Sequence, residues 1–168
     1  MKKPPPIISF VGLHDSGKTT LLAKLIPLLR ERGLRIGVVK HTHHHDFEID
    51  RPGKDSYRLK QAGAERVMIA SDRKIAFVAD NHRRQRSWRE LLPCFQDLDL
   101  LLVEGDKHSS LPKIEVYRKS MQCFPLYPKL RRVIAICTDV PLATKRPQFR
   151  FRDVRAISDF VAERIHKK

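Results

Sequence analysis

Residues 10–20, FVGLHDSGKTT, fit the pattern G-x-x-x-x-G-K-[S/T] and lie between two segments of contrasting character. The residues before the loop, IISFVG at 7–12, form the short apolar run of a buried strand. The residues after it place leucines at helical spacing over 18–32, and Gly33 stands where the helix should end. This strand, loop and helix predict a phosphate-binding loop.

The residue types in the loop indicate what it holds. Glycines let backbone N–H groups turn inward, where they and the helix N-terminus surround phosphate oxygens. Lys18 would place a cation on the β- and γ-phosphates, and Thr19 would give its hydroxyl to Mg²⁺. We therefore predict a nucleoside triphosphate with magnesium. The predicted nucleotide contacts in this loop are Gly12, Leu13, His14, Asp15, Ser16, Gly17, Lys18, Thr19 and Thr20.

Apolar runs alternate with helical patterns along the rest of the chain. The strand-like runs are 34–42, 65–71, 74–80, 98–105, 113–118 and 132–138, and further helices are expected at 55–61, 87–95 and 153–166. Runs that are apolar throughout predict strands covered on both faces, hence a mainly parallel sheet flanked by helices. We expect an α/β, three-layer P-loop NTPase fold forming one nucleotide-binding domain over 1–168.

The runs at 65–71 and 74–80 are separated by only a short polar turn, which predicts an antiparallel hairpin rather than a crossover. A hairpin in an otherwise parallel sheet leaves an edge, and edges are often used for self-association. The pattern suggests a homodimer formed through the hairpin.

Composition narrows the class of protein. The start, MKKPPPIISFVGL, lacks the features of a signal peptide, and no apolar run is long enough to span a membrane. Three widely spaced cysteines favour buried thiols over disulfides, so we expect a cytoplasmic protein. The 34 basic and 19 acidic residues give a net charge of +15, which indicates an acidic partner or a merely solvated surface.

A magnesium site needs carboxylates near the phosphate loop. Glu104 follows four apolar residues where a strand should reach the ligand edge, and Gly105 permits close approach to the γ-phosphate. The polar segment 40–64 supplies Asp50 and Asp55 as further candidates for the hard ion. Its histidines at 41 and 43–45 could bind a transition metal instead, or serve only as hydrogen-bonding groups.

The base is less clearly specified. No Asn-Lys-x-Asp sequence is present, but Thr138 and Asp139 follow the last apolar run. A carboxylate at this place could accept hydrogen bonds from the N1–H and amino group of guanine, which adenine does not offer as a pair. Alternatively, Asp139 only begins the turn before Pro141.

Five segments together resemble the molybdopterin-guanine dinucleotide biosynthesis adaptor (MobB) family. They are GLHDSGKTTL at 12–21, GVVKHTHHHDFEIDRPGKDSYRLKQAGA at 37–64, DLDLLLVEGDKH at 97–108, PKIEVYR at 112–118 and AICTDVP at 135–141. The most specific is the block that begins at Asp50, D-x-P-G-K-D-S-Y-x-x-x-x-A-G-A. The resemblance covers nearly the whole chain.

This resemblance implies a GTP-binding, usually dimeric α/β protein with weak GTPase activity. It implies an adaptor that assists a MobA-like nucleotidyltransferase in attaching GMP to molybdopterin. By matching position, Asp50, Asp55 and Glu104 would lie on the metal and γ-phosphate side, with Asp139 near the base. The chain departs from the family pattern at Asp106, where an apolar or aromatic residue is usual, and in its strong positive charge, which could suit an acidic partner or the pterin phosphate.

The residues leave two other functions open. One is a small-molecule kinase that uses Asp46 or Asp50 as a base, and the other is a basic ATPase that binds nucleic acid. Neither is preferred, because no catalytic apparatus is obvious and the basic clusters lack interleaved aromatic residues. No glutamine is clearly placed after Gly105 to orient an attacking water, so hydrolysis is expected to be slow unless a partner completes the site.

Overall fold

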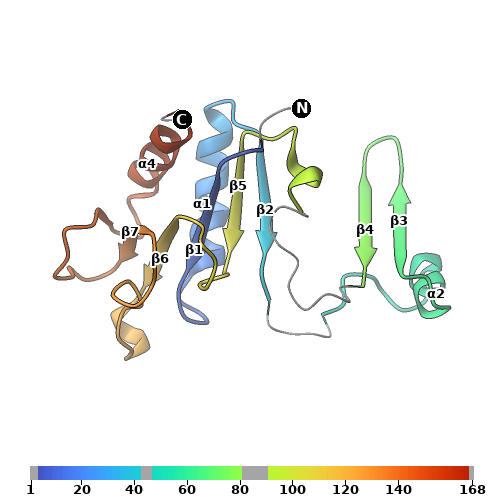
Figure 1. Cartoon of the computed structure of the whole chain (residues 1–168), viewed down its shortest axis with the longest axis horizontal. Helices are drawn as coiled ribbons and strands as arrows, with labels where there is room; N and C mark the ends of the chain where they lie inside the picture. The colour runs from blue at the N-terminus through green and yellow to red at the C-terminus, as the bar shows by residue number, and fades with distance from the viewer. Residues whose placement is uncertain (1–3, 43–46, 81–90, 167–168) are drawn as a thin grey trace. The chain divides into compact units, whose positions relative to one another are not determined.

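The structure is a computed structural model that describes residues 4–42, 47–80 and 91–166. The chain divides into two compact units, one formed by Met1–Thr42 with Leu92–Lys168 and the other by His43–Leu91. The phosphate loop lies in the first unit (Figure 1). Among the described residues, no helix is long and apolar enough to cross a membrane.

The first unit is built on a six-stranded sheet in the order β2-β5-β1-β6-β7-β8, and every neighbouring pair is parallel. Its elements are β1 (Ile7–Val11), α1 (Lys18–Glu31), β2 (Ile36–Lys40), η1 (Leu92–Phe95), β5 (Leu100–Glu104), β6 (Lys113–Tyr117), η2 (Lys119–Met121), β7 (Val133–Thr138), β8 (Gln148–Phe149) and α4 (Val154–His166). The predicted α/β class with a parallel sheet flanked by helices is confirmed.

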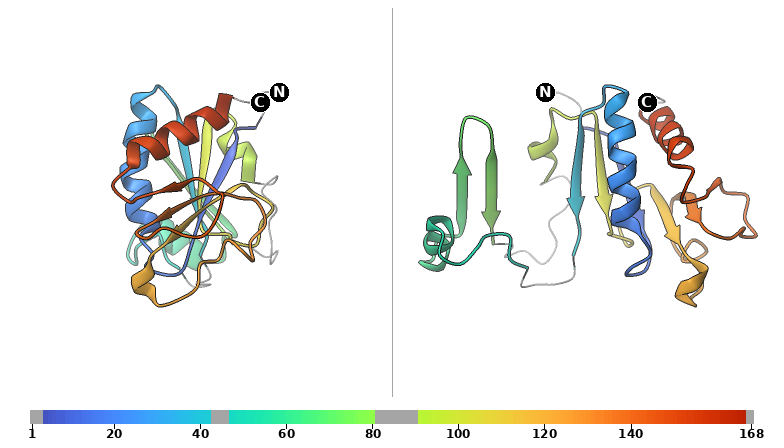
Figure 2. Two further views of the ribbon diagram at one scale, coloured as in Figure 1. Left: turned by 90° about the vertical axis from the view of Figure 1, so that its left-hand side faces the viewer. Right: turned by 180° about the vertical axis from the view of Figure 1, so that it is seen from behind.

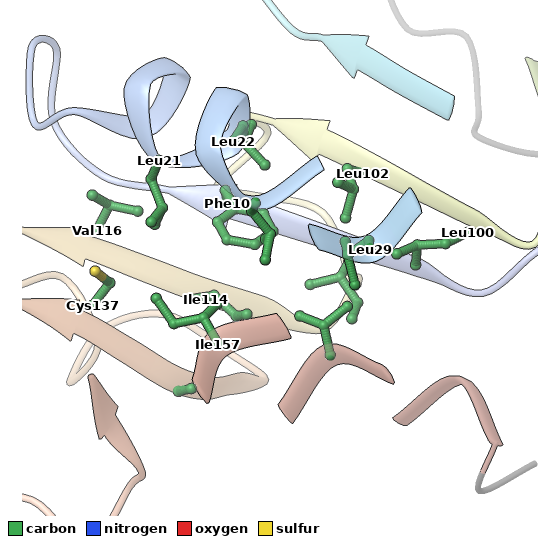
Figure 3. Close-up of a cluster of buried hydrophobic side chains, with 14 residues drawn as sticks. Phe10, Leu21, Leu22, Leu29, Leu100, Leu102, Ile114, Val116, Cys137 and Ile157 are labelled. Atoms are coloured by element: carbon green, nitrogen blue, oxygen red, sulfur yellow. The ribbon is translucent and has the colours of Figure 1, made fainter. Parts of the chain in front are cut away.

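The helices α1 and α4 pack together on one face of the sheet (Figure 2). Leu25 and Leu29 of α1 and Ile157 of α4 are fully buried against alternate residues of the strands, among them Phe10 and Leu102 (Figure 3). Removing such side chains from water supplies roughly 1.5–3 kcal/mol each, which makes this face the core of the unit.

The opposite face of the sheet is buried as well. Leu101 and Val103 of β5 are fully inaccessible, and next to them Leu98 and Phe95 pack over Gly37, where an added Cβ would lie 2.6 Å from the Leu98 side chain. In a strand covered on both faces, no side chain faces solvent, so apolar residues do not alternate with polar ones. The uniformly apolar pattern of residues 100–103 therefore predicted the environment of β5 correctly.

The second unit contains α2 (Asp55–Gln61), β3 (Arg66–Ala70) and β4 (Ile75–Ala79). The two strands pair antiparallel, with Met68 opposite Phe77, so the predicted hairpin is confirmed. Its expected place at an edge of the main sheet was wrong, because β3 and β4 form a sheet of their own. The predicted single domain over both units stays a prediction.

Local details also differ from the expectations. Residues 92–95 form a 3₁₀ helix, and the remainder of the helix predicted at 87–95 lies largely outside the described residues. The three cysteines are free, as expected, but Cys94 and Cys123 are exposed and only Cys137 is buried. Burial raises the pKa of the Cys137 thiol to about 12, so this thiol stays protonated at neutral pH.

Candidate functional site

The phosphate loop connects the end of β1 to the start of α1 at the carboxyl edge of the sheet. Since the strands are parallel, the ends of β5, β6 and β7 meet at this same edge, which brings Glu104, Arg118 and Asp139 to the side of the molecule where the loop lies. Ligands of open α/β sheets bind at this edge. The sheet therefore places three segments, distant in sequence, around one candidate site.

The close approach of β6 explains why the loop needs glycine at two positions. A Cβ on Gly12 would lie 2.3 Å from the carbonyl oxygen of Val116. Gly17 has φ 92°, in the left-handed region, and a Cβ there would lie 3.3 Å from the guanidinium of Arg118. Any larger residue at Gly12 would push the loop away from β6.

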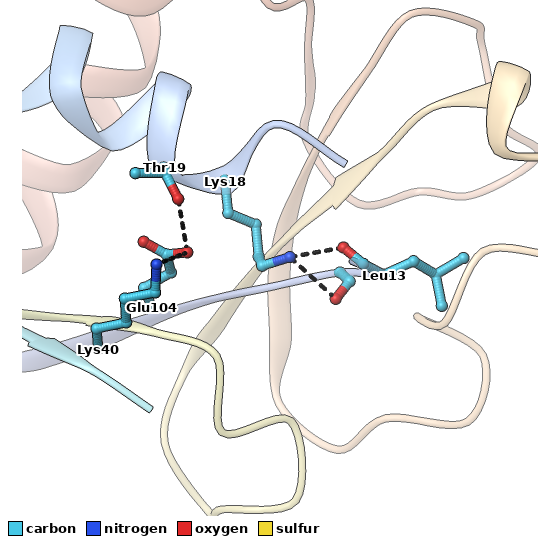
Figure 4. Close-up of polar contacts among 6 residues, drawn as sticks. Leu13, Lys18, Thr19, Lys40 and Glu104 are labelled. Carbon is cyan, nitrogen blue, oxygen red and sulfur yellow. Dashed lines mark hydrogen bonds and ion pairs between the residues drawn. The ribbon is translucent and has the colours of Figure 1, made fainter. Parts of the chain in front are cut away.

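Lys18, the first residue of α1, turns its side chain back into the loop (Figure 4). Its Nζ donates hydrogen bonds to the carbonyl oxygens of Leu13, at 2.6 Å, and Gly12, at 3.3 Å. Burial lowers the pKa of the Lys18 ammonium, and the charges of Glu104 and Asp15 oppose that shift. A partly desolvated cation at the start of a helix is a strong anchor for phosphate oxygens.

The predicted metal ligands Thr19 and Glu104 lie together. Thr19 Oγ1 donates to Glu104 Oε1 at 2.7 Å, and Lys40 Nζ lies 3.9 Å from the same oxygen (Figure 4). The Glu104 side chain is only 12% exposed, so its carboxylate is directed by these neighbours rather than by water. A hydroxyl and a carboxylate oxygen are ligands that Mg²⁺ accepts.

The residues after Glu104 are fixed by backbone contacts. Gly105 has φ 97°, its N–H donates to the Phe10 carbonyl, and its carbonyl accepts from Ser9 Oγ at 2.5 Å. The next residue, Asp106, also has a positive φ, of 56°, a conformation in which aspartate is enriched among non-glycine residues. The positive φ therefore explains why an aspartate is acceptable at position 106, which its negative charge near the phosphate loop did not explain.

Asp50 and Asp55 lie in the second unit, so their predicted grouping with Glu104 stays a prediction. Asp50 accepts a hydrogen bond from the N–H of Arg51, and Asp55 begins α2 with its carboxylate 3.8 Å from Arg58. Residues 43–46, which hold most of the histidine cluster, are outside the described part of the chain. Within that described part, no group of three or more histidine, cysteine or acidic side chains could hold a metal ion.

Asp139 lies in the turn after β7 and also lines a pocket, so its proposed contact with the base stays a prediction. The chain turns after β7, where Thr138 Oγ1 accepts from the N–H of Val140, and Asp139 Oδ1 accepts from the N–H of Lys119 at 3.0 Å. Asp139 also lines a pocket of about 250 Å³. The other lining residues are Thr138, Val140, Pro141, Gln148, Phe149 and Arg150. This volume is below the roughly 300–1,000 Å³ of pockets for whole ligands, so it suits one end of a ligand.

Two residues beside the site were not singled out from the sequence. Glu115, which is 1% exposed, accepts backbone hydrogen bonds from Leu126 at 2.5 Å and Tyr127 at 2.7 Å. Arg118 donates from Nε to the carbonyl oxygen of Ser16 at 3.1 Å. Both belong to the run 113–118, and their only signal was a charged residue within, or directly after, a strand.

The parallel sheet and the glycine-lined loop that leads into α1 define a P-loop nucleotide-binding fold. The family model for MobB, molybdopterin guanine dinucleotide synthesis protein B, matches residues 7–139. The chain belongs to this family, as the resemblance predicted.

Individual relatives agree. The chain is 40% identical over 167 residues to the molybdopterin-guanine dinucleotide biosynthesis adapter protein of Escherichia coli (strain K12), which covers 97% of this chain and 95% of that relative. The adapter protein of Haemophilus influenzae (strain ATCC 51907 / DSM 11121 / KW20 / Rd) is 36% identical over 168 residues, covering 96% and 90%.

Solved structures are similar over nearly their whole length. A crystal structure of molybdopterin-guanine biosynthesis protein B superimposes with a TM-score of 0.72 and 32% identity, covering 96% of this chain and 99% of that one. A crystal structure of Bacillus subtilis MobB gives a TM-score of 0.74 at 28% identity, covering 97% of this chain and 99% of that one.

The substitution Glu115→Gln should change how stability depends on pH. Burial raises the pKa of the Glu115 carboxyl above its ordinary value of 4.5, although the two backbone hydrogen bonds oppose the shift. The folded protein therefore holds this proton more tightly than the unfolded chain, and the contribution of Glu115 to stability falls as pH rises from 4.5 through the folded pKa. We expect the free energy of unfolding in urea, wild type minus variant, to decrease over this interval.

Glu163→Gln removes an exposed carboxylate from α4 and is the matched control for the loss of one charge. A wild-type advantage over Glu115→Gln that increases with pH would contradict the prediction.

Proposed function

We propose that the chain is a GTP-binding adaptor that assists a nucleotidyltransferase in joining GMP to molybdopterin, giving molybdopterin guanine dinucleotide. The observation that carries the proposal is the phosphate loop, where Lys18 turns into the loop and Thr19 is hydrogen-bonded to Glu104 of β5. The chain also belongs to a family whose relatives are named adapter proteins in this biosynthesis. The proposed compartment is the cytoplasm.

The bound group is proposed to be GTP with Mg²⁺. Lys18 and the backbone N–H groups of residues 12–20 would hold the phosphates, while Thr19 and Glu104 would hold the ion or its waters. Asp50 and Asp55 are proposed to join the ion's environment from the second unit. These are oxygen donors, as magnesium requires.

The assignment of guanine rests on Asp139. Its carboxylate lines the pocket after β7 and uses Oδ1 for the N–H of Lys119, which leaves further lone pairs on both oxygens. Two acceptor oxygens match the adjacent N1–H and amino donors of guanine. Adenine does not offer this pair of donors, so it would leave the acceptor oxygens without partners. A site that depends on these hydrogen bonds therefore prefers guanine.

Hydrolysis of GTP is proposed to be slow. The loop from Gly105 to Pro112 contains no glutamine to orient an attacking water. Its backbone is also held in place, since buried Lys113 donates from Nζ to the carbonyl oxygens of Ser109 and Leu111, and Ser9 holds Gly105. The chain would bind the nucleotide and leave the chemistry to a partner.

The partner is proposed to be a MobA-like nucleotidyltransferase with an acidic surface, and molybdopterin is a further candidate ligand. The net charge of +15 favours association with an acidic protein or with the anionic pterin phosphate. The named relatives are adapters rather than kinases or nucleic-acid-binding ATPases, which favours this proposal over both alternatives.

Titration of nucleotides into the protein tests the site. Lys18→Ala should weaken Mg-GTP binding by about tenfold to a hundredfold, since a charge-assisted hydrogen bond contributes about 1.5–3 kcal/mol. Asp139→Ala should weaken GTP but leave ATP unchanged, because only guanine presents the paired donors. Calorimetric titration of GTP and ATP into the three proteins measures both effects. Equal affinity of the wild type for the two nucleotides would refute the guanine assignment.

Reconstitution tests the adaptor role. Added to a purified nucleotidyltransferase with molybdopterin and Mg-GTP, the wild type should raise the yield of molybdopterin guanine dinucleotide, and Lys18→Ala should not, because it cannot hold the nucleotide. The product is measured by chromatography. Formation of the dinucleotide without the transferase would show an enzyme rather than an adaptor.

Self-association through the hairpin is the remaining proposal. Met68, Ile75 and Phe77 lie on one face of the β3–β4 sheet and are 63%, 71% and 50% exposed. Contiguous exposed apolar side chains on a two-stranded sheet are a surface that water disfavours, and such sheets are marginal unless they pack against another element. A second copy of the chain is the proposed partner for this face.

Phe77→Asp should shift the protein toward the monomer by placing a charge in the centre of this face. Phe124→Asp is the matched control, because Phe124 is 92% exposed but lies in the first unit. Sedimentation velocity measures the proportion of dimer. A dimer that survives Phe77→Asp and is lost in Phe124→Asp would place the interface elsewhere.

A further inference from the structure

Arg118 occupies an unusual position directly after β6. Its guanidinium carbon lies 3.8 Å from the centroid of the Phe151 ring, and its Nε donates to the carbonyl oxygen of Ser16 at 3.1 Å. On the loop side, the guanidinium lies where a Cβ of Gly17 would be only 3.3 Å away. The side chain is therefore packed between the phosphate loop and the segment that follows β8.

The residue after Arg118, Lys119, contacts the second part of the proposed nucleotide site. The N–H of Lys119 donates to Asp139 Oδ1 at 3.0 Å, and Asp139 lines the pocket assigned above to the base. Phe151, whose ring stacks against the Arg118 guanidinium, follows Arg150, which lines that pocket. Two consecutive residues thus contact both parts of the proposed nucleotide site.

The chemistry of arginine suits this position. A planar guanidinium can stack on an aromatic ring while Nε–H, which lies in its plane, donates sideways to a carbonyl oxygen. Lysine has the same charge, but its ammonium is a compact, strongly hydrated group that cannot lie flat between a ring and a glycine. Geometry and charge can therefore be separated by experiment.

We propose that Arg118 is a positioning residue that couples the phosphate loop to the Asp139 pocket, so that the triphosphate and the base are bound as one ligand. The inference rests on the proposed function, because it presupposes that both parts hold one nucleotide. It adds that the spacing between them is set by Arg118 through Ser16, Gly17 and Phe151.

Loss of this coupling has a distinct signature. A ligand that occupies only the phosphate loop does not depend on the spacing between the two parts, whereas a whole nucleotide does. Removing Arg118 should weaken a guanine nucleotide and reduce the preference for guanine over adenine. A merely structural role would weaken all ligands alike or lower stability without changing base preference.

The test compares wild type, Arg118→Lys, Arg118→Gln, Asp139→Asn and the double variant Arg118→Gln/Asp139→Asn. Each is titrated calorimetrically with Mg-GTP, Mg-ATP and Mg-tripolyphosphate. We expect both Arg118 variants to lose about five- to twentyfold in affinity for GTP, a loss in the range of couplings between contacting groups. Their affinity for tripolyphosphate should change by less than about threefold.

The double variant gives the decisive comparison. If Arg118 and Asp139 act as one unit, Arg118→Gln should cost much less in the Asp139→Asn background than in the wild type. Arg155→Gln, which removes an exposed arginine from α4, controls for the loss of charge and should bind GTP as the wild type does. Should Arg118→Gln fail to fold by circular dichroism, Phe151→Leu removes the ring beneath the guanidinium and takes its place.

Several results would overturn the inference. These are wild-type affinity in Arg118→Lys, which would reduce the role to charge, additive losses in the double variant, and an equal loss for GTP and tripolyphosphate. Unchanged GTP binding in Arg118→Gln would overturn the inference alone. Failure of the wild type to bind Mg-GTP would overturn the proposed function, and the inference with it.

Discussion

The close approach of β6 to the phosphate loop is the constraint on which the site depends. The carbonyl oxygen of Val116 lies 2.3 Å from the position that a Cβ of Gly12 would take, and the guanidinium of Arg118 packs against Gly17. The two glycines of the motif are thus required by the neighbouring strand as well as by the phosphate. Because β6 pairs with β1 on one side and β7 on the other, the centre of the sheet fixes the position of the loop.

The protein itself supplies partners for the charged groups Lys18 and Glu104, whereas the buried Ser16 Oγ in the phosphate loop has no hydrogen-bond partner among the described residues. Lys18 donates to two loop carbonyls, and Glu104 accepts from Thr19. Phosphate oxygens and a magnesium ion would compete with these internal partners rather than meet bare charges. The net gain on binding is then a difference between two sets of hydrogen bonds, so modest changes in geometry translate into appreciable changes in affinity.

Sequence patterns predicted features that depend on local chemistry. The phosphate loop, the helix after it and the doubly buried strand at residues 100–103 each follow from glycine placement or from apolar spacing within a single segment. The placement of the hairpin did not follow, because which strands share a sheet depends on pairing between segments far apart. The patterns for 65–71 and 74–80 are the same whether those strands join the large sheet or stand apart.

The burial of charged side chains could not be predicted from sequence patterns either. In KIEVY, Lys113 and Glu115 alternate with apolar residues, a pattern that usually marks a half-exposed strand, yet both are buried. Their hydrogen-bond partners are backbone groups: the carbonyl oxygens of residues 109, 111 and 131 for Lys113, and the N–H groups of residues 126 and 127 for Glu115. Arg118 finds Ser16, which is 102 positions away.

These buried charges bear on how an adaptor could work. Lys113 fixes the segment after Glu104, and Glu115 fixes the segment that begins at Leu126, so the described loops near the phosphate loop are tied to the sheet by charged side chains that are costly to displace. A nucleotide held by such a frame is presented in a defined position. Under the proposed function, the partner transferase would supply the groups for the catalytic step.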